Sequence, residues 1–488
     1  MEPHTEYGDL PPEEFRRYGH QLIDWITGYL ANPEQYRVLP DVKPGDIRRQ
    51  LPAAPPEQPV SLGDILADFE QQILPGVTHW NHPGFFAYFA ITASVPGILA
   101  ELLIAALNVN GMLWKTSPSA TELEQVALDW LRQMLGLGEG WFGIINDTAS
   151  ISSLLALAAA REAKPELDIR QRGMAGRADL PVLRVYTSEQ SHSSIDKAAI
   201  TLGIGHENVV HIGTDDNFRM RPDLLEAAIA ADRERGYLPL AAVATVGTTS
   251  TTSVDPVPAI AAICHRENVW LHVDGAYGGI AAILPEKRHI FEGVEQADSL
   301  VVNPHKWLFT PIDLSTFYTR HPDSLRRAFS LVPEYLVTAE QNEVVNFMDY
   351  GVQLGRRFRA LKLWMVIRAF GVEGLAARIR GHIALAQHFA SCVRQAQDWE
   401  LLAPTPFSTV CFRFAPEGAD EATLDRWNEA ILNRVNASGK VYLSHTKLRD
   451  HFTLRLAIGN LRTERRHIDE AWNYLTRAGS QVADVKVH

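Results

Sequence analysis

The chain has 488 residues, 46% of them hydrophobic, and a formal net charge of −12 at pH 7. This length predicts several structural units, and this hydrophobic content is enough for a large packed core. An acidic chain has no broad basic field, which argues against partners such as nucleic acid or an anionic membrane surface.

Two further features bear on where the protein works. The first ten residues carry three carboxylates and no apolar core, so we do not expect a secretory signal. Three widely spaced cysteines, without CxxC or HExxH patterns, favour a cytoplasmic location and argue against a disulfide framework or a metal site. The longest apolar stretch, residues 96–114, is interrupted by Glu101, Asn108 and Asn110, which predicts a buried helix and turn rather than a membrane span.

The N-terminal part is predicted to be helical and extended. Residues 12–31 have apolar side chains at helical spacing, and a second helix is expected over residues 62–73. The proline-rich residues 40–59 between them predict an extended connector. Because such elements bury little core by themselves, we expect residues 1–94 to form a separate segment that packs on another subunit.

Two short segments are candidates for binding sites. Residues 80–89 are aromatic and irregular, which fits either core packing or the wall of an apolar pocket. Residues 146–150, Asn-Asp-Thr-Ala-Ser, follow Ile144-Ile145 and lead into a predicted helix. The free amides of a helix start can bind a phosphate, although an ordinary Ser/Thr cap is the more common meaning of this pattern alone.

Two other local patterns concern the helix before that segment. Thr121 and Glu124 fit a capping box, which predicts that a helix starts there, and Gly136 is placed to end it. Residues 138–143 match GxGxxG, but they precede a strand-like run instead of linking a strand to a helix. We therefore reject a dinucleotide-binding loop.

Strand-like and helix-like runs alternate in the middle of the chain, which predicts a mostly parallel sheet with crossover helices. The expected strands are residues 182–186, 209–212, 240–245, 269–273 and 300–302. The expected helices are residues 195–202, 222–235 and 257–267.

Polar side chains follow these strands. His192, Thr249, Asp274 and Lys306 each come shortly after a strand end, and ligands bind at the carboxyl edge of such sheets. A lone lysine there is usually a surface residue. A lysine and a carboxylate at neighbouring strand ends, however, suit pyridoxal phosphate, since the lysine can form a Schiff base and the carboxylate can pair with the ring nitrogen.

The C-terminal part predicts a small α+β unit. Residues 331–345 lack a clear period and are expected to form a mobile loop. The elements expected after it are a helix over 356–397, a strand over 410–414, a helix over 421–437, strands over 441–443 and 453–458, and a helix over 464–478. We place the domain boundaries at 1–94, 95–366 and 367–488.

Several motifs occur together in this chain and in one order. They are His82-Pro-Gly-Phe-Phe-Ala-Tyr-Phe, Ser117-Pro-Ser-Ala-Thr-Glu-Leu-Glu, His192-Ser-Ser, Gly247-Thr-Thr-Ser, His272-Val-Asp-Gly-Ala-Tyr, Asn303-Pro-His-Lys-Trp and Gly355-Arg-Arg-Phe. With them the chain resembles the pyridoxal-phosphate-dependent group II amino-acid decarboxylases, and most closely the enzymes that act on aromatic amino acids. The resemblance implies an α/β fold of the aspartate aminotransferase type (fold type I), an intertwined homodimer, and conversion of an aromatic L-amino acid to its amine and carbon dioxide.

The resemblance also implies residue roles. Lys306 would hold the cofactor as a Schiff base, Asp274 would pair with the ring nitrogen, His192 would stack on the ring and Ala276 would pack below it. Tyr335, on a loop given to the partner subunit's site, would place a proton on Cα. Further cofactor contacts are expected from Thr148, Ala149, Ser150, Thr249, Asn303 and His305. Substrate contacts are expected from Trp80, Tyr88, Phe89, Asn110, Met112 and Gly355.

The sequence departs from the family pattern at positions that bear on substrate choice. Ala90 and Ile91 stand where many relatives have a proline and a hydroxyl residue, which removes a polar contact to the substrate carboxylate. Asn110 and Met112 replace more apolar residues that reach across the dimer in animal relatives. Gly355 leaves more room than the serine of some tyrosine-preferring relatives, which favours bulky rings.

Three other activities are compatible with the same cofactor. Aldehyde synthases of this family tend to lack the loop tyrosine or the histidine of the His-Ser-Ser motif, whereas Tyr335 and His192 are both present here. An acidic substrate would need an extra cation for its distal carboxylate. Aminotransfer could use the same lysine and carboxylate and would be recognised by its keto-acid product.

Overall fold

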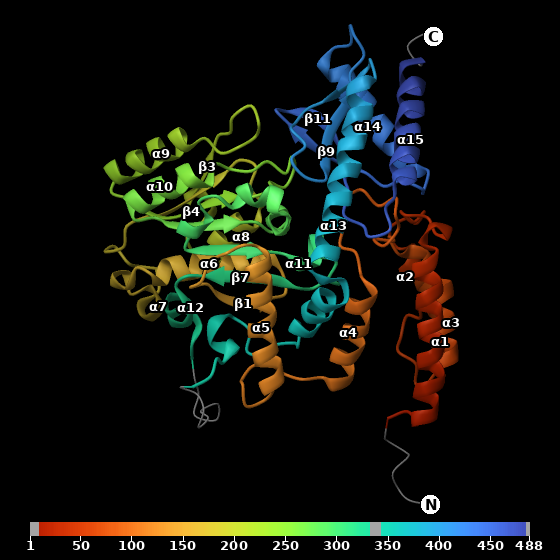
Figure 1. The fold of residues 1–488 in the computed structure, drawn as a ribbon, viewed down its shortest axis with the longest axis horizontal. Coiled ribbons are helices and arrows are strands. Elements are labelled where there is room, and N and C mark those ends of the chain that lie inside the picture. The colour runs from red at the N-terminus through yellow and green to blue at the C-terminus, as the bar shows by residue number, and fades with distance from the viewer. Residues whose placement is uncertain (1–8, 332–342, 485–488) are drawn as a thin grey trace, which may run out of the picture.

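The computed structural model describes residues 9–331 and 343–484, and its centre is a seven-stranded sheet (Figure 1). The strands are β1 (Phe142–Asn146), β2 (Leu183–Ser188), β3 (Val209–Ile212), β4 (Leu238–Thr245), β5 (Trp270–Asp274), β6 (Ser299–Val302) and β7 (Ser315–Thr319). Their order is β1-β7-β6-β5-β4-β2-β3. β7, which the sequence did not predict, is antiparallel to β1 and β6, and the other neighbours are parallel.

Helices join these strands and cover the sheet. They are α5 (Pro118–Met134), α6 (Ala149–Glu162), α7 (Ile169–Arg172), α8 (Ser194–Thr201), α9 (Pro222–Glu234), α10 (Val257–Glu267), α11 (Pro304–Trp307) and α12 (Pro322–Phe329). The capping-box prediction was wrong. The Ser117 hydroxyl accepts a hydrogen bond from the Ala120 amide at 3.2 Å, and Pro118 suits the first helical position, so α5 begins earlier than expected.

The two faces of the sheet enter different hydrophobic cores. Along β4, Ala242 and Ala244 belong to the core that α5, α9 and α10 complete, while Ala241 and Val243 belong to the core of α6 and α8. This alternation follows from the two-residue period of a strand. A sheet buried on both faces explains why its strands are nearly continuous apolar runs, and the predicted mostly parallel α/β sheet is confirmed.

The long helix α13 (Ala360–Gln395) leads into the C-terminal unit and is interrupted at Gly371, whose φ is +65°. This unit has an antiparallel sheet of β8 (Trp399–Leu401), β9 (Thr409–Phe414), β10 (Ser444–Leu448) and β11 (His451–Ala457), packed against α14 (Glu421–Ala437) and α15 (Arg465–Asp484). The strand expected at 441–443 was misplaced. Tyr442 makes an isolated bridge to Phe85, and the strand follows it.

The N-terminal segment stands at the edge of the molecule in Figure 1, with α1 (Pro12–Ala31), α2 (Asp46–Gln50) and α3 (Leu62–Asp68). Neither α1 nor α3 has a buried residue. The next helix, α4 (Val95–Leu107), buries Gly97, Ala100 and Ile104 but leaves Leu102 51% and Leu107 59% exposed, so in the single chain the expected buried helix is buried on one side only. Among the described helices none combines the length and apolar character of a membrane span. The three domain ranges stay predictions.

Candidate active site

A cavity of about 480 Å³ lies at the carboxyl edge of the central sheet. Its walls come from the segments that follow β1, β2, β4, β5 and β6, together with β10, β11 and the aromatic segment before α4. The predicted site residues that line it are Tyr88, Phe89, Thr148, Ala149, Ser150, His192, Thr249, Asp274, Ala276, Asn303, His305 and Lys306. Parallel strands bring residues far apart in sequence to one place because their carboxyl ends share one edge.

Lys306 lies in the short helix α11, directly after β6. Its Nζ is 5.2 Å from the centre of the Phe89 ring, and it has no hydrogen-bond or ion-pair partner within the described residues. Burial lowers the pKa of Lys306, and the charge of Arg455 acts in the same direction while Asp274 opposes them. A lowered pKa increases the fraction of neutral amine, which is the form that attacks a carbonyl.

Asp274 ends β5 and is buried, with 6% of its surface exposed. One carboxylate oxygen, Oδ1, accepts a hydrogen bond from the Ala276 amide at 3.0 Å. No ion pair reaches Asp274 from the described part of the chain. A buried carboxylate without a cation is costly, so the position is suited to a positively charged ligand atom such as a protonated ring nitrogen.

His192 follows β2 and remains exposed to solvent where it lines the cavity. Its Nδ1 accepts a hydrogen bond from the Ser194 amide at 3.1 Å, which leaves the ring proton on Nε2. Desolvation by the surrounding protein lowers the pKa of His192, with a further contribution from the charge of Lys306. The ring is therefore a neutral imidazole that can donate from Nε2 near neutral pH.

The N-terminus of α6 forms one end of the cavity. Thr148, the residue before the helix, makes no side-chain cap, so the first amides, those of Ala149 and Ser150, face the site without an internal acceptor. The buried Asn303 has an amide oxygen with no partner among the described residues. The free first-turn amides fit a ligand that carries a phosphate, whereas the unpaired oxygen of Asn303 is an acceptor and suits a donor group on that ligand.

His305 completes this end of the site. Its Nδ1 accepts a hydrogen bond from the Leu314 amide at 2.9 Å, so a neutral ring carries its proton on Nε2. Burial, followed by the charge of Lys306, lowers the pKa of His305 to about 3. The residues present therefore fit pyridoxal phosphate at both ends, with donors for the phosphate and a carboxylate for the ring nitrogen.

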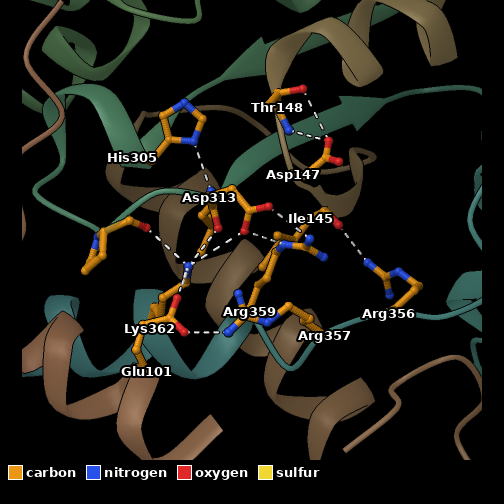
Figure 2. A network of polar contacts seen from close by, with 12 residues as sticks. Glu101, Ile145, Asp147, Thr148, His305, Asp313, Arg356, Arg357, Arg359 and Lys362 are labelled. Atoms are coloured by element: carbon orange, nitrogen blue, oxygen red, sulfur yellow. Dashed lines mark hydrogen bonds and ion pairs between the residues drawn. The ribbon is translucent and has the colours of Figure 1, made fainter. Parts of the chain in front are cut away.

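Behind His305 lies a buried polar network that links α4 and α13 to the segment between α11 and β7 (Figure 2). The Lys362 ammonium is 2.7 Å from a Glu101 carboxylate oxygen and donates to the backbone carbonyls of Asp313, at 2.8 Å, and Pro311, at 3.2 Å. Arg359 pairs with the Asp313 carboxylate at 2.9 Å. The network fixes Pro311 and Asp313, just before Leu314, and thereby helps to hold His305.

A second buried pair fixes the end of β1. Arg356 donates to the Glu124 carboxylate and to the Ile145 carbonyl, both at 2.7 Å, and the same carboxylate accepts from the Ile145 amide at 2.8 Å. Glu124 was predicted to cap α5; instead it lies inside the helix and joins α5 to β1. This contact sets the position of the Asp147-Thr148 turn, which leads into the N-terminus of α6 where a phosphate would bind.

Arg455 is a cavity residue that the sequence analysis missed. It lies on β11 and is 4% exposed. Its Nε donates to the Ser250 carbonyl at 3.0 Å, another nitrogen donates to the Tyr88 carbonyl, and the guanidinium carbon lies 4.6 Å from the centre of the Phe89 ring. One guanidinium nitrogen is buried without a partner within the described residues. A guanidinium with one unpaired nitrogen suits a substrate carboxylate.

The structure adds an aromatic floor to the cavity. Tyr277 stacks on Phe89 with ring centres 3.9 Å apart and on Trp307 at 4.7 Å. Tyr277 belongs to the motif around Asp274, but its sequence position alone gave no sign that its ring would lie beneath Phe89. Three other lining residues, Ser194, Gly247 and Ser250, belong to motifs that the sequence analysis singled out without a stated role. The lining residues that it missed are Thr245, Ser444, His445 and Thr446.

Four predicted substrate residues do not line the cavity of this chain. Trp80 forms a second layer by stacking on Phe85 and Tyr88. Asn110 is bonded to the Arg356 amide and to the Met112 sulfur, and Gly355 lies beside Asn110. Asn110, Met112 and Gly355 could contact substrate only across a subunit interface, in the active site of a second subunit. Tyr335 lies outside the described residues, and its role stays a prediction.

Comparison with known proteins agrees with this geometry. The pyridoxal-dependent decarboxylase conserved domain matches residues 44–415. Phenylacetaldehyde synthase of Arabidopsis thaliana is 42% identical, over 96% of this chain and 97% of its own, and tryptophan decarboxylase 2 of Oryza sativa subsp. japonica is 41% identical, over 97% and 96%. The crystal structure of Oryza sativa TDC with PLP and tryptamine superimposes with a TM-score of 0.93 at 38% identity, covering 97% of this chain and 99% of that one.

Fold and site together define a pyridoxal-phosphate-dependent enzyme of fold type I. The chain belongs to the pyridoxal-dependent decarboxylase family, in its aromatic amino-acid decarboxylase-like group, and is a carboxy-lyase. The family, fold and cofactor predictions are confirmed. The relatives include both decarboxylases and aldehyde synthases, so the family alone does not distinguish these two products.

Proposed function

We propose that this enzyme decarboxylates an aromatic L-amino acid and releases the corresponding amine and carbon dioxide. The observation that carries the proposal is the cavity itself. It combines an unpaired lysine, a buried carboxylate and a neutral histidine with an aromatic floor and a guanidinium that has one unpaired nitrogen.

The distribution of charge in the cavity supports an aromatic substrate. Apart from Lys306, Arg455 is the permanent cation among the described lining residues, and it can bind one carboxylate. We assign it to the α-carboxylate. A distal carboxylate would then have no cation, whereas an aromatic ring can pack against Phe89 and Tyr88. The contact between Arg455 and the α-carboxylate also compensates for the polar group that is absent at Ala90 and Ile91.

The chain's own residues then have the following roles. Lys306 would hold the cofactor covalently, and Asp274 would keep a proton on its ring nitrogen. The chemistry that pyridoxal phosphate supplies when bound is an electron sink for the bond broken at Cα. Arg455 orients the carboxylate that leaves. His192, through Nε2, together with Tyr335, delivers a proton to Cα.

The competing product is an aldehyde, since phenylacetaldehyde synthases are among the relatives. That route consumes oxygen and releases ammonia and hydrogen peroxide. His192 and Tyr335 are both present in this chain, which favours protonation of Cα and therefore the amine.

A substrate screen tests the proposed substrate class. Purified holoenzyme is incubated with tyrosine, dopa, phenylalanine, tryptophan, 5-hydroxytryptophan, glutamate and cysteine sulfinate, and carbon dioxide release is measured. We expect release from at least one aromatic substrate and background levels with the two acidic ones. Preferential decarboxylation of an acidic substrate would contradict the assignment of Arg455 as the cation for the α-carboxylate.

We also propose that the enzyme is a cytoplasmic homodimer. Phe15 on α1 is 68% exposed, and α4 exposes Leu99, Leu102 and Leu107. Apolar faces of this kind on neighbouring segments suit a second copy of the chain. Light scattering at micromolar concentration should give twice the mass of one chain, and the mass of one chain would refute the dimer. The free cysteines of the structure agree with a reducing compartment.

A further inference from the structure

We propose that Asp196, His206 and His211 form a binding site for a transition-metal ion, with Zn²⁺ as the reference ion, separate from the active site. Asp196 lies in the first turn of α8, His206 starts a short 3-10 turn (His206–Asn208), and His211 lies in β3. The absence of CxxC and HExxH patterns argued against a metal site from the sequence alone. The fold brings these three residues together from three elements.

The distances between the candidate ligand atoms fit a bound ion. The Asp196 Oδ1 atom is 3.2 Å from His206 Nε2 and 3.1 Å from His211 Nε2, and the ligand atoms of the three residues all lie within 4.8 Å of one another. Zinc binds histidine nitrogen and carboxylate oxygen at about 2.0–2.2 Å, which places tetrahedral ligands about 3.3 Å apart. A metal can therefore enter with small side-chain rotations.

The chemistry of the donors selects the class of ion. Two imidazoles and one carboxylate favour Zn²⁺, Co²⁺, Ni²⁺ or Cu²⁺ over Mg²⁺ and Ca²⁺, which prefer oxygen ligands alone. The side chains of His206 and His211 are 67% and 42% exposed, so water can complete the coordination and the ion can enter from solvent. Without metal, both Nε2–H groups can donate to the shared carboxylate. With metal, each neutral ring would carry its proton on Nδ1 instead.

An ion at this position would tie the active-site edge of the sheet together. α8 begins at Ser194, whose amide donates to His192, and β3 pairs His211 with Thr187 of β2. The ion would thus join the first turn of α8 to β3, next to the turn that carries His192. We expect metal binding to protect the backbone amides of α8 from hydrogen exchange.

Calorimetry tests the site directly. Holoenzyme freed of chelators and excess cofactor is titrated with ZnCl₂, and CoCl₂ provides a visible spectrum of the bound ion. We expect one zinc per chain, and His206→Gln and His211→Gln should each weaken binding by about 10-fold or more. His265→Gln, which alters another exposed histidine on α10, is the matched control and should bind like the parent.

Hydrogen exchange provides the second readout, with circular dichroism and cofactor content confirming that each variant is folded. Zinc should slow exchange over residues 194–201 in the parent and in His265→Gln, but not in the other two variants. The proposal is overturned if the parent binds no zinc, or if His206→Gln and His211→Gln bind it as tightly as the parent does.

Discussion

Two regions of this enzyme each contain a lysine inside the fold, Lys362 fully buried and Lys306 partly exposed to the cavity, and they differ in what surrounds the ammonium group. Around Lys362, a carboxylate and two backbone carbonyls satisfy the charge (Figure 2). The ammonium of Lys306 makes no hydrogen bond or ion pair with the described residues, and it lies 5.2 Å from the centre of the Phe89 ring. Burial lowers the pKa of both lysines.

The comparison shows that burial alone does not make a lysine reactive. A lysine whose three donors are satisfied is held in one place and stabilises the fold, as Lys362 does between α4 and the segment before β7. A lysine without acceptors faces the cavity as a nucleophile. The network around Lys362 is nevertheless connected to the site, since it fixes the chain next to Leu314, which bonds to His305.

The largest expected effect is on catalytic activity, which should distinguish a substitution of Lys306 from one of Lys362. Lys306→Met should lower decarboxylation by about three orders of magnitude or more and should abolish the visible absorbance of the bound cofactor, because no amine remains to hold it. Lys362→Met should retain that absorbance in the fraction that folds. Both quantities are measured on purified protein, and normal absorbance in Lys306→Met would remove Lys306 from its assigned role.

The next largest effect is on the free energy of unfolding, which should distinguish the same two variants in the opposite sense. Lys362→Met removes the donor from two backbone carbonyls and from one oxygen of the Glu101 carboxylate, whose other oxygen keeps its bond to Arg357. We expect it to lower the free energy of unfolding by about 3 kcal/mol. Lys306→Met breaks no such contact and should change it by less than about 1 kcal/mol. Denaturant unfolding of the two cofactor-free variants provides the measurement. Equal losses would show that the network around Lys362 has no special role.

A smaller effect is expected at Arg455. Arg455→Met removes a charge-assisted contact with the substrate carboxylate, so kcat/KM should fall about 10- to 100-fold, in line with about 1.5–3 kcal/mol for such a bond. Cofactor absorbance should stay at the parent level, and Arg455→Lys should recover part of the loss. If kcat/KM is unchanged, the substrate carboxylate is bound elsewhere.

The smallest expected effect per residue is the change in the free energy of unfolding with pH. Burial lowers the pKa of His305 to about 3 and those of His272 and His382 to about 4, from an ordinary value of 6.5. Below pH 6.5 the unfolded chain binds these protons and the folded chain does not, so stability falls as pH falls from 6.5 toward 4. Each histidine should cost about 1 kcal/mol between about pH 7 and about pH 5.5. Unfolding that is independent of pH in this window would contradict the neutral, buried state of these rings.

Much of the site could be predicted because it follows strand ends. Asp274 and Lys306 each come after an apolar run, and the parallel sheet brings such ends together whatever the details of packing. Arg455 could not be found in this way. It lies on a strand of the C-terminal unit, and only the packing of the two units brings its side chain to Ser250 and Tyr88.

Two buried polar residues could not be placed from the sequence, for similar physical reasons: Lys362, about which no prediction was made, and Glu124, whose predicted role was wrong. Lys362 carries the residue type typical of an exposed helix face, and its burial depends on Glu101, which is distant in sequence. Glu124 fitted a capping box, but Ser117 already caps α5, and the carboxylate is needed by Arg356. In both cases a long-range polar contact determined the position, and local pattern does not contain that information.

The central claim is that this cavity converts an aromatic amino acid to an amine. The most direct measurement compares carbon dioxide, amine and hydrogen peroxide in one reaction of the parent holoenzyme, under air, with the aromatic substrate it prefers. The account predicts one amine for each carbon dioxide and no peroxide above that of Lys306→Met. Peroxide and ammonia formed in step with carbon dioxide, without amine, would contradict it and identify an aldehyde synthase.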